Sequence, residues 1–182
     1  CTSSSGVTAT DSASDWTGAF CDAGSTVRSD LSFTNDVLGS QLRSGLPPAE
    51  IKSSLSNYID RAADSATVSV SRLDEAGSPS VDGGDQIAEA AKVKYTNVSK
   101  QLEDLQAKVQ AMPTSSLNQF TAALKPISEQ IAQISRDIAG SFKELERFPG
   151  YSEILAASKK VDENGTLGAP IGSCKKLQEV RQ

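Results

Sequence analysis

Apolar residues recur at intervals of three and four along most of this chain, which is the spacing of helices that bury one face. The first helix is predicted from about Asp15 to Gly45. Its apolar positions are Trp16, Phe20, Ala23, Val27, Leu31, Leu38 and Leu42. The second helix is predicted to carry Pro47 and Pro48 in its first turn, where a missing N–H costs no hydrogen bond, and to stop before Gly77. Its apolar stripe is Ile51, Leu55, Tyr58, Ala62, Ala66, Val70 and Leu73.

Two more long helices follow a breaker loop at residues 77–84, after which Asp85 can cap the third helix. The third helix ends at Pro113, and its apolar positions are Ala91, Tyr95, Val98, Leu102, Leu105, Val109 and Met112. The fourth holds the clearest heptad, interrupted only by Ser141, and Pro126 inside it is expected to kink or split the helix. Its apolar positions are Leu117, Phe120, Leu124, Ile127, Ile131, Ile134, Ile138, Leu145 and Phe148.

The C-terminal part of the chain carries shorter elements. A short helix is predicted from Tyr151 to about Val161, and a last helical turn from Lys175 to Val180. Long helices joined by short loops lie antiparallel to their neighbours. The sequence therefore predicts an all-α fold for residues 15–182, an elongated antiparallel bundle of about four long helices plus a short C-terminal helical segment.

Composition excludes several classes of function. The chain has 18 Lys and Arg against 23 Asp and Glu, and its scattered basic residues form no patch for nucleic acid. It has no histidine, which excludes Ser-His-Asp and Cys-His catalysis and histidine-based metal sites. Its carboxylates recur along polar helix faces, where solvation explains them. We therefore predict no enzyme, and no catalytic, cofactor-binding or metal-binding residues.

The three cysteines stand at positions 1, 21 and 174. Cys1 is followed by small polar residues, so residues 1–14 are predicted to form a flexible tether rich in Ser and Thr. Export processing that cleaves before a cysteine and then acylates it leaves such a terminus, which resembles the mature start of a bacterial lipoprotein. An ordinary thiol at a processed end is the alternative. With Cys21, Cys174 and the Asp82-Gly83-Gly84-Asp85 segment, the chain resembles the small secreted lipoproteins of actinobacteria.

The resemblance implies that Cys1 is lipidated and holds the protein on the outer face of the cell membrane, where disulfides persist. Cys21 and Cys174 are then natural disulfide partners, with two buried free thiols as the alternative. The implied function is a non-enzymatic accessory or structural subunit docking on an integral membrane complex, for example a respiratory supercomplex.

Two other classes of function remain open. A carrier for a lipid or other apolar ligand of the cell envelope would require an enclosed apolar cavity. An enzyme that uses only carboxylates, Lys and Tyr would require Asp or Glu clustered inside a cleft.

Overall fold

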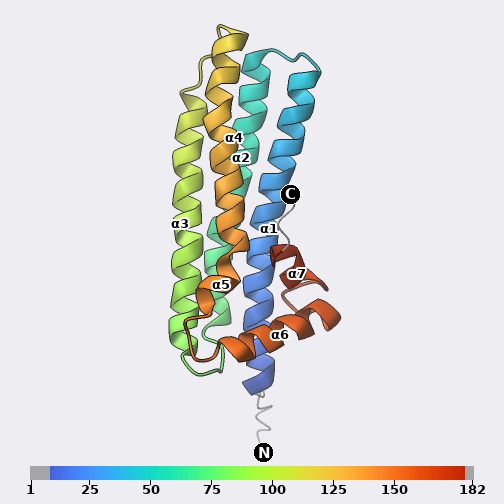
Figure 1. The fold of residues 1–182 in the computed structure, drawn as a ribbon, viewed down its shortest axis with the longest axis vertical. Coiled ribbons are helices and arrows are strands. Elements are labelled where there is room, and N and C mark those ends of the chain that lie inside the picture. Colours follow the sequence, from blue (N-terminus) through green and yellow to red (C-terminus); the bar gives the residue numbers. More distant parts are fainter. Residues whose placement is uncertain (1–8, 179–182) are drawn as a thin grey trace, which may run out of the picture.

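The computed structural model describes residues 9–178, which fold as an all-α domain. Four long helices lie antiparallel along the length of the molecule: α1 (Ala9–Arg43), α2 (Pro48–Ala76), α3 (Gly84–Gln110) and α4 (Leu117–Ala139) (Figure 1). Three shorter helices gather toward the end at which α1 begins: α5 (Ser141–Leu145), α6 (Tyr151–Asn164) and α7 (Ser173–Gln178). The predicted fold class is confirmed.

The core lies between the four long helices and follows the predicted apolar stripes closely. All seven positions predicted for the third helix are buried, six of them on α3 and Met112 just after its end. The heptad residues Ile131, Ile134 and Ile138 of α4 are buried as well. On α1 the stripe is buried from Trp16 to Leu38, whereas Leu42 is exposed near the end of the helix. The heptad pattern of the sequence therefore identifies the faces that the helices bury.

The stripe of α2 differs from the prediction at two positions. Ile59 and Ser69 are buried, whereas the predicted Tyr58 and Val70 are only half-buried. Burial of Ser69 is tolerated because its hydroxyl donates to the Ser65 carbonyl over 2.7 Å. Tyr58 lies at the edge of the bundle, where its ring packs against an exposed phenylalanine of α1 with 5.2 Å between ring centroids.

Helix α1 begins at Ala9, earlier than the predicted start near Asp15, so residues 9–14 of the predicted tether are helical. Two contacts favour the longer helix. Ala13 is buried in the core, and the Ser12 hydroxyl is bonded to Ser80 of the loop before α3 over 3.2 Å. The remainder of the predicted tether, with Cys1, lies outside the described residues.

The sequence predicted a kink or a split of the fourth helix at Pro126, and the split does not occur, because α4 runs unbroken through this residue. Pro126 cannot bond the carbonyl of Ala122, but both residues are exposed, so water can satisfy that carbonyl. The break comes instead at Gly140, which separates α4 from α5. Ser141, the interruption of the heptad, is buried, and its hydroxyl donates to the Ile138 carbonyl.

The C-terminal segment is fastened to α1. Cys21 and Cys174 form the predicted disulfide, with their Cα atoms 4.6 Å apart. The Arg28 guanidinium donates to the carbonyls of Lys176 and Leu177 over 2.7 and 2.6 Å, which caps the last turn of α7. Across residues 9–178, the helices include none that combines the length and the apolar character needed to span a membrane.

Candidate functional site

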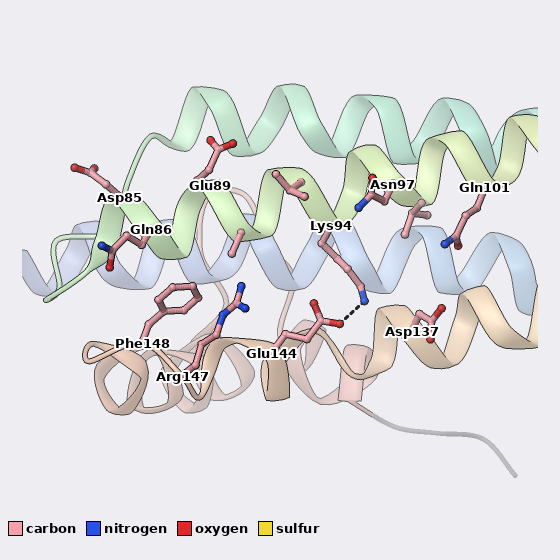
Figure 2. A pocket seen from close by; sticks show the side chains of 13 residues that line it. Asp85, Gln86, Glu89, Lys94, Asn97, Gln101, Asp137, Glu144, Arg147 and Phe148 are labelled. Atoms are coloured by element: carbon pink, nitrogen blue, oxygen red, sulfur yellow. Dashed lines mark hydrogen bonds and ion pairs between the residues drawn. The ribbon is translucent and has the colours of Figure 1, made fainter.

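A groove runs along one side of α3, facing the end of α4, α5 and the residues after α5 (Figure 2). Its volume is about 650 Å³. Helix α3 supplies one wall through residues three or four apart, which share a helix face. These wall residues are Gln86, Ala90, Val93, Lys94, Asn97 and Gln101. The facing wall consists of Asp137, Glu144, Arg147 and Phe148, so the groove exists because the chain turns at Gly140.

Apolar side chains form the floor of the groove. Ala90 and Phe148 are partly buried against the core, and Val93 remains 48% exposed in the middle of the α3 wall. An apolar surface uncovered between two helical walls is the arrangement that accepts an apolar side chain of a partner. The floor therefore gives the groove a hydrophobic contact surface.

Charged residues surround this floor. Lys94 reaches across from α3 to form an ion pair with Glu144 of α5 (Figure 2). The Arg147 guanidinium lies over the Phe148 ring, 4.8 Å from its centroid, in a cation–π contact. The remaining charged side chains of the groove are three carboxylates, at Asp85, Glu89 and Asp137. Four carboxylates against two cations give the groove a negative balance.

The carboxylates lie on the rim of the groove and not inside a closed cleft. Asp85, Glu89 and Glu144 are exposed, and Asp137 is half-buried, with its carboxylate accepting a hydrogen bond from Gln133 over 2.7 Å. Within the part of the chain that the structure describes, no three Asp, Glu or Cys side chains are grouped so as to hold a metal ion. Exposed carboxylates on the rim of a groove can pair with basic side chains of a partner.

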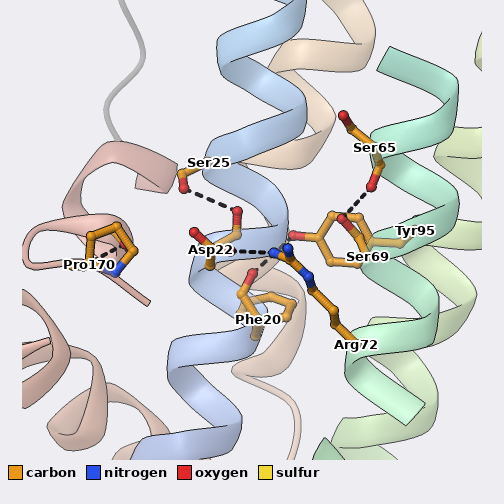
Figure 3. A network of polar contacts seen from close by, with 9 residues as sticks. Phe20, Asp22, Ser25, Ser65, Ser69, Arg72, Tyr95 and Pro170 are labelled. Atoms are coloured by element: carbon orange, nitrogen blue, oxygen red, sulfur yellow. Dashed lines mark hydrogen bonds and ion pairs between the residues drawn. The ribbon is translucent and has the colours of Figure 1, made fainter. Parts of the chain in front are cut away.

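A second hollow of about 660 Å³ lies between α1, the end of α2 and the loop before α7. The Arg72 guanidinium donates to the Asp22 carboxylate there over 2.7 Å, and Pro170 lies on the other side of Asp22 (Figure 3). This ion pair joins α2 to α1 close to the disulfide. The second hollow thus has a structural ion pair in its wall.

Among the described residues, those predicted from the sequence to carry function, Cys21 and Cys174, do not line the groove. Cys1 lies outside the described residues, and Cys21 and Cys174 are fully buried between α1 and α7. One feature of the sequence could have indicated the groove. Val93 is apolar but lies outside the buried stripe that contains Ala91 and Tyr95, so it leaves an apolar side chain on another face of the helix.

Comparisons of this chain with models of known protein families, with curated proteins and with solved structures found no match. Function must therefore be inferred from the chain's own residues.

Proposed function

We propose that this protein is a non-enzymatic lipoprotein on the outer face of a bacterial cytoplasmic membrane, where it docks as an accessory subunit on an integral membrane complex. The Cys21–Cys174 disulfide is consistent with an extracytoplasmic location, because such bonds persist in oxidising compartments. The observation that carries the docking role is the groove along α3, with its apolar floor and acidic rim.

The occupant that fits this groove is a basic amphipathic segment of the partner. Its apolar side chains would cover Val93, and its Lys or Arg residues would meet Asp85, Glu89 and Asp137 on the rim. From Asp85 to Gln101 the α3 wall is about 24 Å long at 1.5 Å per residue, which is room for roughly four turns of a docked helix.

The carrier alternative is less well supported by this geometry. A carrier for an apolar ligand would enclose it, whereas the groove is open along α3 and bordered by six charged side chains. The long helices meet through a continuous cluster of buried apolar residues that includes Leu31, Leu55, Leu102 and Ile131. This close packing favours the accessory role.

Affinity purification from native membranes tests the docking role with two matched variants. Val93→Glu places a charge on the groove floor, and Val68→Glu places the same charge on an equally exposed valine of α2 that does not line the groove. We expect Val68→Glu to co-purify the same integral membrane subunits as the wild type, identified by mass spectrometry, and Val93→Glu to lose them. Equal recovery with both variants would contradict docking in the groove.

The lipid anchor has a separate test. Each buried CH₂ of an acyl chain contributes about 0.8 kcal/mol to membrane binding, and two or more chains hold a protein firmly. We expect the wild type to fractionate with membranes and Cys1→Ser to be released with its fold intact. If intact-mass analysis finds unmodified Cys1 in membrane-extracted protein, the lipid anchor is contradicted. Docking in the groove is tested separately, by the affinity purification.

A further inference from the structure

Two of the most exposed apolar side chains among the described residues belong to one short loop. Leu167 is fully exposed and Ile171 is 63% exposed, and both lie between α6 and α7. Single exposed apolar residues are common on protein surfaces, but here two strongly exposed ones lie within five positions of the same loop.

This loop is held rigidly. Thr166 and Ala169 exchange two backbone hydrogen bonds, of 2.8 and 3.3 Å, so Leu167 lies at the tip of a tight turn. Ala169 is buried, and Thr166 packs so closely on α1 that a Cβ added to Gly18 would come within 2.4 Å of its hydroxyl. Leu167 is therefore presented to the outside by a fixed turn.

Lysines flank the loop on both sides. Lys159 and Lys160 are exposed on α6, and Lys175 and Lys176 are exposed on α7. Residues 151–178 carry these four lysines against three acids, although the whole chain has a net charge of −5. One of the acids, Asp162, uses its carboxylate to accept the backbone N–H of Lys175 over 2.9 Å. This C-terminal segment is therefore weakly basic within an acidic protein, while Asp22, Arg72 and Glu75 border the hollow on the other side of Leu167.

The loop lies toward the end of the molecule at which α1 begins (Figure 1). It packs on Gly18, about 14 Å along the helix from Ala9 at 1.5 Å per residue. The eight residues before Ala9 can span at most about 28 Å. An acyl chain on Cys1 would hold this end of the bundle close to the bilayer. A lipid surface is therefore the partner that the exposed apolar residues of the loop would contact.

We propose that the Gly165–Gly172 loop inserts Leu167 and Ile171 into the interface of an anionic membrane, with the flanking lysines contacting lipid headgroups. The membrane location rests on the proposed function, and the inserted loop adds to it a second contact beside the anchor. Apolar side chains flanked by Lys are the combination that binds anionic bilayer interfaces. Two contacts at one end of the bundle fix its tilt relative to the membrane, which one anchor point alone does not.

Vesicle binding by Cys1→Ser protein, which carries no acyl chain, tests the loop independently of the anchor. The probe is a tryptophan introduced by Leu167→Trp, because the natural Trp16 is buried and its emission should not change. We expect a blue shift on adding vesicles of equimolar phosphatidylglycerol and phosphatidylcholine, and a smaller shift at high salt or with phosphatidylcholine alone. The control is Leu117→Trp, at a 56% exposed leucine that begins α4 at the opposite end of the bundle (Figure 1). Equal shifts at the two positions, or none at Leu167→Trp, would overturn the proposal.

A second measurement does not depend on the added tryptophan. We expect Leu167→Asp and Ile171→Asp each to lower co-sedimentation with the anionic vesicles by about tenfold, and Leu117→Asp to leave it unchanged. If neither loop variant lowers binding, the loop does not insert. That outcome would leave the anchor and the groove untouched, because membrane retention through Cys1 and recovery of partner subunits are measured on the acylated protein.

Discussion

The hydroxyl of Tyr95, on α3, donates a hydrogen bond over 3.3 Å to the backbone carbonyl of Phe20, on α1, inside the bundle (Figure 3). The Tyr95 side chain is fully buried, and the edge of its ring meets Phe20 with 6.0 Å between the ring centroids. Burial raises the pKa of Tyr95 well above its usual range. This contact joins α1 and α3 at the level of the disulfide, and from the burial of Tyr95 we expect the stability of the fold to depend on alkaline pH.

Tyr95→Phe should lower the free energy of unfolding by about 0.5–1.5 kcal/mol at neutral pH, because one net hydrogen bond is lost. Above the ordinary tyrosine pKa of about 10, the unfolded chain releases a proton that the folded chain retains, so the wild type loses stability as pH rises. Tyr95→Phe lacks this loss. Urea unfolding at neutral pH and about one unit above the ordinary tyrosine pKa should show the two proteins converging in stability. A constant difference between them would mean that Tyr95 ionises as easily in the folded chain as in the unfolded one.

Replacing two glycines of α1 by alanine should change the stability of the protein in opposite directions. A Cβ at Gly24 would lie 2.3 Å from Leu177 Cδ1 and 2.5 Å from the Tyr95 hydroxyl, so Gly24→Ala should destabilise by about 1–3 kcal/mol. A Cβ at Gly39 would meet only the tip of Arg43, at 3.4 Å, so Gly39→Ala should stabilise by about 0.5–1 kcal/mol through helix propensity. Thermal melts of both variants check the pair. A gain in stability for Gly24→Ala would show that α7 can move away from α1 at no cost.

Ile134→Ala should cost about 2–5 kcal/mol, because Ile134 is buried at the centre of the α4 heptad and truncation leaves a cavity. Val68→Ala removes apolar atoms from a half-exposed position of α2 and should stay within about 0.5 kcal/mol of the wild type. Chemical denaturation measures both. Equal effects of the two substitutions would place Ile134 outside the core.

The cysteine pair should be oxidised in protein taken from the cell envelope. Non-reducing peptide mapping should recover a cross-linked peptide that contains Cys21 and Cys174, and thiol reagents should label neither residue before reduction and unfolding, since both are fully buried. The bond closes a loop of 153 residues, and a Cys21→Ala, Cys174→Ala double variant should lose up to about 5 kcal/mol on the chain-entropy estimate. Free thiols at both positions would contradict the prediction that the disulfide forms in the cell envelope.

The parts of the fold that could be predicted from the sequence are those where apolar and polar positions contrast strongly. In α3, apolar residues such as Leu102 and Leu105 alternate with Lys, Glu and Gln, and all the predicted positions are buried. In α2, Ala and Ser occupy both faces around Ala62 and Ser69, so the pattern did not decide between Tyr58 and Ile59. The start of α1 was predicted too late because Ser, Thr and Ala suit a tether and a packed helix equally well.

The groove could not be predicted, because it depends on where the chain leaves the bundle. The sequence favoured a kink or a split at Pro126, whose effect on the backbone is local and strong. In the structure, the exposed side of α4 accommodates this proline, and the turn at Gly140 brings Glu144 and Phe148 opposite α3. Helix periodicity shows which face of a helix is buried. It does not show how far apart two neighbouring helices lie, and therefore it does not show where a groove opens between them.

The disulfide also determines how the protein carries mechanical load. Residues 21–174 form a covalently closed ring, since Cys21 lies near the start of the bundle and Cys174 lies in its last described helix. A force pulling on the two ends of the chain enters at Cys21 and leaves at Cys174 through two sulfur atoms, so α2 to α6 lie outside the load path. Tension therefore extends only the segments outside the ring, and the groove along α3 keeps its shape under a pull that would unravel an unlinked bundle.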